Sequence, residues 1–222
     1  MRERSRARAE IAAGAAVAGA AGAVYLFRKW QRKSSATAEE SRRRMPLDEE
    51  VAEPTFLTNR AITIRALPQH IWPWIAQMGE PPRGGFYGYR PVERLLGMKV
   101  VRNADDVLPE WQNPQVGDAL DRAGRVRVKA VQRNEFLVVG LVSAPEYAGT
   151  WTLALYPIDG TTRLVSRCRA RLPKGIRGRA WRVLLDAGQF LMERKMLAGI
   201  RHRAEKLAAR THFDILPERK AG

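Results

Sequence analysis

GQFLMERKMLAGIRHRAEKL, residues 188–207, is the stretch of sequence that decides the fold. Small and apolar side chains recur at every third or fourth position through this stretch and the residues before it: Trp181, Leu185, Gly188, Met192, Met196, Ile200, Ala204 and Leu207. Because an α-helix has about 3.6 residues per turn, this spacing places them on one face. The sequence therefore predicts one amphipathic helix of about seven to nine turns, beginning near Ile176.

Four strand-like segments precede this helix and are joined by short connections. They cover residues 125–131, 135–142, 150–156 and 162–171, and turn-forming residues bound each of them. Short connections are typical of antiparallel neighbours, so the four segments predict an antiparallel meander. A further strand is predicted over residues 59–66, followed by a short helix that begins at Pro68.

The order of these elements predicts an α+β fold. An antiparallel sheet does not leave its apolar face in water, and the final helix is the only predicted element long enough to cover that face. We therefore expect a curved antiparallel sheet wrapped on a long C-terminal helix, with a cavity between them. This ligand-binding domain is expected over residues 55–210, with a tail over residues 211–222.

The last predicted strand has two faces of different chemistry. Small or apolar side chains alternate with arginines along it: Leu164, Ser166, Cys168 and Ala170 against Arg163, Arg167, Arg169 and Arg171. If the small face points at the helix, its size leaves room for a ligand. The arginines then form an outer basic stripe, which either rests on anionic lipid or only keeps the outer face hydrated.

A glycine-rich loop, GGFYGY at residues 84–89, also bears on function. A phosphate-binding loop continues into Lys followed by Ser or Thr, and this loop does not. It carries aromatic rings instead, which suit the rim of an apolar pocket, although Trp and Met at regular spacing usually pack in a core. The candidate ligand-binding residues are Trp74, Phe86, Tyr87, Tyr89, Trp111, Trp151, Met192 and Met196.

The N-terminal segment predicts a membrane anchor. Residues 11–27 carry no charge, and seventeen residues is near the lower limit for a helix that crosses a bilayer. The bulky residues and a basic cluster follow the small residues, which is the wrong order for a cleaved signal peptide, and no polar face exists for a surface helix. We expect a single-pass helix after a basic N-terminus, residues 1–10, and before a polar linker, residues 28–54.

Charge indicates the orientation and the partners. Seven Lys and Arg lie in residues 28–44 against four before the apolar segment, which favours a cytoplasmic C-terminal domain. The net charge of +16 is concentrated at the two ends of the chain, so a continuous groove for nucleic acid is disfavoured and an anionic membrane surface is the expected partner. One cysteine and three scattered histidines give no metal-ligand spacing, and we expect neither a metal nor a cofactor.

Four stretches together make the sequence resemble a bacterial subfamily of the START-like, or Bet v 1-like, superfamily: ITIRALPQHIWPWIAQMG, GGFYGY, RNADDVLPEWQNPQVGD and FLMERKMLAGIRHRAE. This superfamily is also called SRPBCC and has polyketide cyclase/dehydrase-like members. The resemblance covers about residues 55–210 and implies a helix-grip fold with a deep cavity for a hydrophobic small molecule. It implies no reaction, because members include lipid carriers, ligand sensors and a few cyclases. The chain departs from the subfamily near Arg90 and Pro91, where an acidic residue and a Trp are expected.

Two functions therefore stay open. The favoured one is a membrane-anchored domain that binds a hydrophobic small molecule or lipid, as a carrier or sensor. The alternative is a cyclase- or dehydratase-like enzyme that uses Asp105, Asp106 or Glu110 as a general base. Adjacent acids in a loop rich in Asn and Pro usually cap turns, and the sequence lacks a GxSxG nucleophile motif, so we favour binding over catalysis.

Overall fold

The computed structural model describes residues 36–89, 103–141, 149–172 and 176–215, together with positions 19, 22, 25 and 26. The chain divides into two compact units, residues 1–35 and residues 36–222, and the fold below is that of the second. Within the described residues no helix combines the length and hydropathy needed to cross a membrane. Most of the predicted anchor, residues 11–27, and the departure at Arg90 and Pro91 lie outside the described residues.

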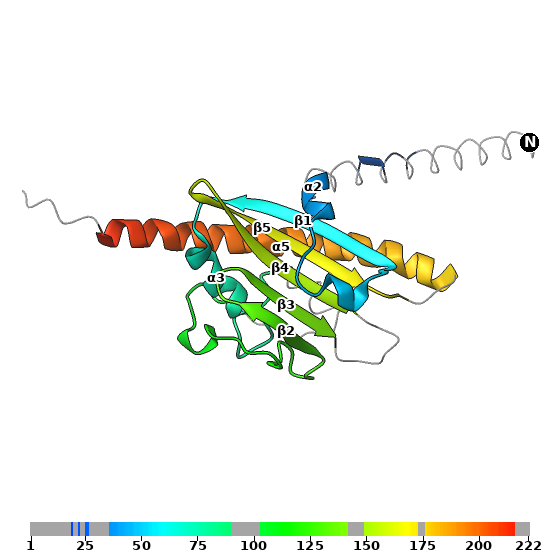
Figure 1. Cartoon of the computed structure of the whole chain (residues 1–222), viewed down its shortest axis with the longest axis horizontal. Coiled ribbons are helices and arrows are strands. Elements are labelled where there is room, and N and C mark those ends of the chain that lie inside the picture. Colours follow the sequence, from blue (N-terminus) through cyan, green and yellow to red (C-terminus); the bar gives the residue numbers. More distant parts are fainter. Residues whose placement is uncertain are drawn as a thin grey trace, which may run out of the picture. The chain divides into compact units, whose positions relative to one another are not determined.

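Five strands form one antiparallel sheet (Figure 1). They are β1 (Phe56–Ile64), β2 (Val126–Gln132), β3 (Phe136–Leu141), β4 (Gly149–Ile158) and β5 (Thr161–Ala170). The strand order is β1-β5-β4-β3-β2, so β2 to β5 make the predicted meander and β1 pairs with the far side of β5. Alternation decides which side chains point inward, as in β1, where Thr58, Arg60 and Ile64 are buried on one face.

Two α-helices cover the inner face of the sheet. The first, α3 (Pro68–Ala76), begins with proline at its first turn, where the missing N–H costs nothing. The second, α5 (Ile176–Ile215), has 40 residues and is therefore about 60 Å long, which exceeds the predicted seven to nine turns. Its last turns lack the apolar pattern that marks a buried face, but Ala and Arg are good helix formers there.

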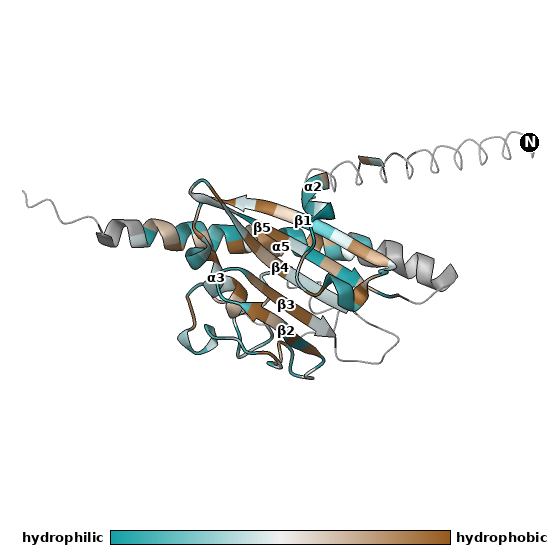
Figure 2. Cartoon of the chain, viewed as in Figure 1, coloured by the Kyte–Doolittle hydropathy of each residue, from teal (hydrophilic) through white to brown (hydrophobic). Residues whose placement is uncertain are grey.

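The main core lies between the sheet and these two helices. Ile64 and Leu164 from the sheet pack with Ile71 of α3 and Ile200 of α5, and all four side chains are fully buried. Figure 2 shows hydrophobic residues along β3 and β4, the middle of this layer. The predicted helix-grip arrangement, an antiparallel sheet wrapped on a long C-terminal helix, is thus confirmed for the described residues.

The outer face of the sheet is covered as well, by a segment that we call the N-terminal strap, residues 36–52. It contains α2 (Ala38–Arg42) and the short 3₁₀ helix η1 (Asp48–Val51). Met45 of the strap is buried against Ala154 of β4 and Val165 of β5, which makes a small second core. The sequence predicts a polar linker here, but residues 36–52 are part of the folded unit because Met45 and Val51 are buried.

The strap also covers the arginines of β5, so the predicted outer stripe is not a free surface. Arg167 is 2% exposed and donates hydrogen bonds of 2.6 Å to Asp48 Oδ2 and Asn59 Oδ1. It also donates to the backbone carbonyls of residues 40, 41 and 43. Arg163 binds Glu40 at 2.7 Å, and the Arg163 hydrogen bond lowers the pKa of Glu40. Neither the lipid-contact nor the hydration interpretation of this stripe therefore holds for Arg163 and Arg167.

Candidate functional site

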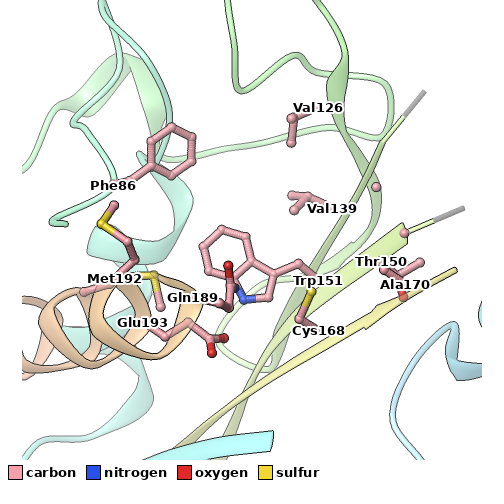
Figure 3. A pocket seen from close by; sticks show the side chains of 13 residues that line it. Phe86, Val126, Val139, Thr150, Trp151, Cys168, Ala170, Gln189, Met192 and Glu193 are labelled. Atoms are coloured by element: carbon pink, nitrogen blue, oxygen red, sulfur yellow. The ribbon is translucent and has the colours of Figure 1, made fainter. Parts of the chain in front are cut away.

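A cavity of about 290 Å³ lies between the sheet and α5 (Figure 3). This volume is at the lower end of the range for small-molecule sites. The cavity is partly open, and its walls come from α5, from β2 to β5 and from the loop after α3. The residues that line it are Phe86, Val126, Val139, Gly140, Gly149, Thr150, Trp151, Cys168, Ala170, Gln189, Met192, Glu193 and Met196.

One face of α5 supplies a wall with both apolar and polar side chains. Gln189, Met192, Glu193 and Met196 stand at positions i, i+3, i+4 and i+7, which places them on the same side of the helix. The two methionines are flexible and polarisable, and they adapt to ligands of different shape. The amide and the carboxyl group make one end of an otherwise apolar cavity polar, as Figure 3 shows.

Glu193 is held by a network that joins α5 to β1 and β5. Ser166 Oγ donates to Glu193 Oε1 over 2.6 Å, and Arg60 Nε donates to Oε2 over 3.1 Å. The Thr58 hydroxyl lies 3.4 Å from Oε2. Trp151 extends the network, because its Nε1 donates to Ser166 Oγ over 2.8 Å. The glutamate is 2% exposed, and a buried carboxyl group needs such partners to be tolerated.

Burial dominates the titration of the acidic groups beside the cavity. It raises the pKa of Glu193, although the Ser166 hydrogen bond and the positive charge of Arg60 act against it. Burial, together with the charge of Glu193, raises the pKa of the Cys168 thiol to about 12. A thiol with so high a pKa is not a nucleophile at neutral pH.

Arg60, which anchors the network, is shielded from the solvent. Its guanidinium is 5% exposed and stacks over the ring of Phe190 at 4.7 Å from the ring centre. A second acid, Asp186, lies 3.6 Å from Arg60 on the other side. The positive charge thus lies behind Glu193 and does not line the cavity.

Phe86 reaches the cavity because Gln77 fixes the glycine-rich loop. Gln77 is fully buried, and its Nε2 donates to Tyr87 Oη over 3.2 Å and to the Asp106 carbonyl. Its Oε1 accepts from the Leu108 N–H, which ties the loop that begins at residue 103 to the same point. One buried amide therefore sets the position of both loops at this end of the domain.

The sequence-predicted ligand residues divide into two groups of four. Phe86, Trp151, Met192 and Met196 line the cavity. The other four do not line it: Trp74, Tyr87, Tyr89 and Trp111. Which of the lining residues touch a ligand stays a prediction, but the structure brings the first four together around one space.

The four residues away from the cavity have other contacts. Tyr87 is 1% exposed and packs on Gly199 of α5, where an added Cβ would lie 3.1 Å from Tyr87 Cβ. Tyr89 is 44% exposed. Trp111 carries the guanidinium of Arg83 over its ring at 4.4 Å, whereas Trp74 is buried in the main core.

The three candidate catalytic acids lie on the surface. Asp105 binds Arg203 of α5 at 2.8 Å, and both Asp106 and Glu110 are exposed. None of the three lines the 290 Å³ cavity. Asp105 and Asp106 border a smaller hollow of about 200 Å³ beside the C-terminal part of α5, together with Trp74.

Sequence reasoning missed Glu193, Gln189 and Arg60 as parts of the site. A signal for two of them was present: Glu193 interrupts the apolar stripe of the long helix, and Arg60 shares the inward face of its strand with Ile62 and Ile64. A charged residue on each of two facing apolar surfaces indicates a buried pair. No group of His, Cys, Asp and Glu suited to a metal ion is found in the part of the chain that the structure describes.

Comparisons with known proteins add distant likenesses. The sequence matches no protein-family model and no curated protein. Among solved structures it is similar to a START superfamily protein from Mycobacterium smegmatis, with 12% identity, a TM-score of 0.38, and coverage of 68% of this chain and 98% of that one. It is also similar to the protein TTHA0849 from Thermus thermophilus, with 14% identity, a TM-score of 0.37, and coverage of 67% of this chain and 96% of that one.

A third similar structure is the di-domain ARO/CYC StfQ from the steffimycin biosynthetic pathway. Its identity is 11% and its TM-score 0.44, with coverage of 72% of this chain and 54% of StfQ. The similar proteins that name an organism are bacterial, and the fold in common is START-like. Likenesses at this distance say nothing about the reaction or the ligand, so the function has to be argued from the cavity.

Proposed function

We propose that this chain binds a hydrophobic small molecule or lipid in the 290 Å³ cavity between the sheet and α5, and that it works as a carrier or sensor. The observation that carries this proposal is the cavity itself. Its described lining is mainly aliphatic, aromatic and thioether, with a few polar groups at one end, the usual make-up of a small-molecule site.

Two observations favour binding over catalysis. The acids that sequence reasoning offers as a general base, Asp105, Asp106 and Glu110, do not reach the cavity. The thiol beside the cavity, Cys168, has a pKa of about 12 and stays protonated at neutral pH.

Ligand retention in the purified full-length chain tests the proposal. The chain is prepared without detergent, so that no additive occupies the cavity, and bound compounds are identified by native mass spectrometry followed by extraction. Val126→Trp places a large ring at the cavity wall and should abolish retention, whereas Val116→Trp, at a position 67% exposed, should not. An empty wild-type chain that also fails to bind N-phenyl-1-naphthylamine, a neutral apolar fluorophore, contradicts the proposal.

We propose further that residues 11–27 hold this domain at the cytoplasmic side of a membrane. Support comes from the uncharged segment, its basic flanks and the larger number of Lys and Arg after it. The basic residues 28–33 supply the contact with anionic lipid, since the strap covers Arg163 and Arg167.

Two arginines inside the segment test this second proposal. Val17→Arg with Ala21→Arg should release the full chain from alkali-washed membranes, because each charge at the centre of a span costs about 2.5–3.5 kcal/mol. Ala209→Arg, on the exposed face of α5, is the matched control and should stay with the membrane. Protease added outside intact cells should leave residues 36–222 uncut, and cleavage there would contradict the cytoplasmic orientation.

A further inference from the structure

The polar end of the cavity is chemically one-sided. The described residues that line the cavity include one carboxyl group, Glu193, and contain no Lys, Arg or His. This differs from the chain as a whole, which carries a net charge of +16. Any charged group of a ligand that enters the cavity therefore meets a wall that is negative or neutral.

The hydrogen-bond donors around Glu193 are directed at the carboxyl group. Ser166 Oγ and Arg60 Nε donate to it, and the indole N–H of Trp151 is taken by Ser166. The Gln189 amide also donates to Glu193, which lowers the pKa of the glutamate and fixes the NH₂ side of that amide toward it. What Gln189 and Glu193 present to the cavity is therefore mainly oxygen atoms that accept hydrogen bonds.

We propose that the cavity selects an uncharged ligand with an apolar body and a hydroxyl donor at one end, and that it rejects molecules that end in a carboxylate. The hydroxyl donates to Glu193 or to the Gln189 carbonyl oxygen, while the body lies along Trp151, Met192 and Val139. A carboxylate would face the Glu193 carboxyl group in a site of low dielectric, where like charges repel strongly. This inference rests on the proposed function and narrows its ligand class.

Three probes with the same ten-carbon chain test the inference: 1-decanol, 1-methoxydecane and decanoic acid. The ether keeps the oxygen but cannot donate, and the acid is ionised at pH 8. Displacement of N-phenyl-1-naphthylamine from the full-length chain gives the three affinities. We expect decanol to bind at least about ten-fold more tightly than decanoate, and more tightly than the ether, because charged and donor-deficient groups leave the acceptors unpaired.

Two variants locate the discrimination. Glu193→Gln keeps the shape of the side chain and removes its charge, so the preference for decanol over decanoate should fall to within about three-fold. Glu205→Gln makes the same change on the same helix, beside Arg65 and away from the cavity, and should keep the wild-type preference.

The outcomes separate the two proposals. If the fluorophore binds but decanoate equals or exceeds decanol in the wild-type chain, the inference is wrong and the proposed function stands. That result would match what the overall charge of +16 alone predicts. If neither the fluorophore nor any of the three probes binds, the proposed function fails and the inference fails with it. The wild-type comparison decides the matter even if Glu193→Gln does not fold.

Discussion

Ser166 on β5 and Glu193 on α5 are joined by a 2.6 Å hydrogen bond between two side chains that are 0% and 2% exposed. The contact links the sheet to the long helix at the polar end of the cavity. It also passes the indole N–H of Trp151 and the guanidinium of Arg60 into the same network. The stability of the fold and the chemistry of the cavity therefore depend on the same side chains.

Ser166→Ala should destabilise the protein by about 1–3 kcal/mol, because it leaves the Trp151 N–H and one oxygen of Glu193 without their partner in a buried place. Urea unfolding of both proteins, followed by circular dichroism, measures the difference. Thr161→Ala is the control: it removes a hydroxyl from the exposed end of the same strand and should change stability by no more than about 0.5 kcal/mol. Equal effects of the two substitutions would show that the Ser166 network contributes nothing.

The titration of Glu193 predicts a slope of stability with pH. Its pKa is raised above the ordinary 4.5, so above pH 4.5 the unfolded chain has released a proton that the folded protein still holds. The free energy of unfolding therefore falls as the pH rises through this window. Glu193→Gln removes the slope, so the stability of the wild type relative to this variant should decrease from pH 4.5 upward.

Glu40 provides the opposite case within the same protein. Its pKa is lowered, chiefly by the hydrogen bond from Arg163, so it contributes stability above pH 4.5 that is lost as the pH falls through the lowered value. The wild type should therefore lose stability relative to Glu40→Gln on acidification below pH 4.5. Urea midpoints over a pH series measure both differences, and slopes of the same sign for the two variants would refute the assignment.

Arg167→Met should cost about 3–5 kcal/mol, because it leaves Asp48, Asn59 and several carbonyls of the strap without their buried donor. Unfolding in urea measures the loss, and faster trypsin cleavage within residues 36–52 shows that the strap is released. Arg125→Met, on a side chain 71% exposed, is the control and should be nearly neutral. A strap that stays protected in Arg167→Met would contradict its anchoring by this residue.

Replacing the three loop acids together separates binding from catalysis. Asp105→Asn, Asp106→Asn and Glu110→Gln should leave affinity for N-phenyl-1-naphthylamine within about two-fold, because none of these side chains lines the cavity. A small loss of stability is expected from the partly exposed Asp105–Arg203 pair. If the wild type converts a co-purified ligand and the triple variant does not, the enzyme hypothesis replaces ours.

Much of the fold follows from periodicity. Alternation in the strands and the three-to-four spacing in the long helix predict a meander covered by one helix, which is the arrangement found. The strap could not be predicted in this way, because only Met45 and Val51 are buried in a segment that is otherwise polar. Two apolar residues give no period, and the buried guanidinium of Arg167 looks in the sequence like any surface arginine.

The site was predictable only where a side chain had no alternative partner. Tyr87 has the composition of a rim residue, but its hydroxyl meets Gln77 and its ring lies beneath Arg203, so it packs inside the protein. Phe86, its neighbour, has no polar atom to satisfy and lines the cavity. Glu193 went unrecognised because its meaning depends on Arg60, which lies 133 positions earlier in the chain.

The loops and the strap have a last consequence for association between copies of the chain. The backbone N–H of Ala36 donates to the Asn59 carbonyl, which occupies part of the outer rim of β1. At the opposite rim Gly117 donates to the Val128 carbonyl and Val128 donates to Asp118, so a loop lies along β2. Unprotected rims of a sheet invite another strand and lead to fibrils. With both rims occupied, a crowded population of these molecules is protected against polymerising strand by strand.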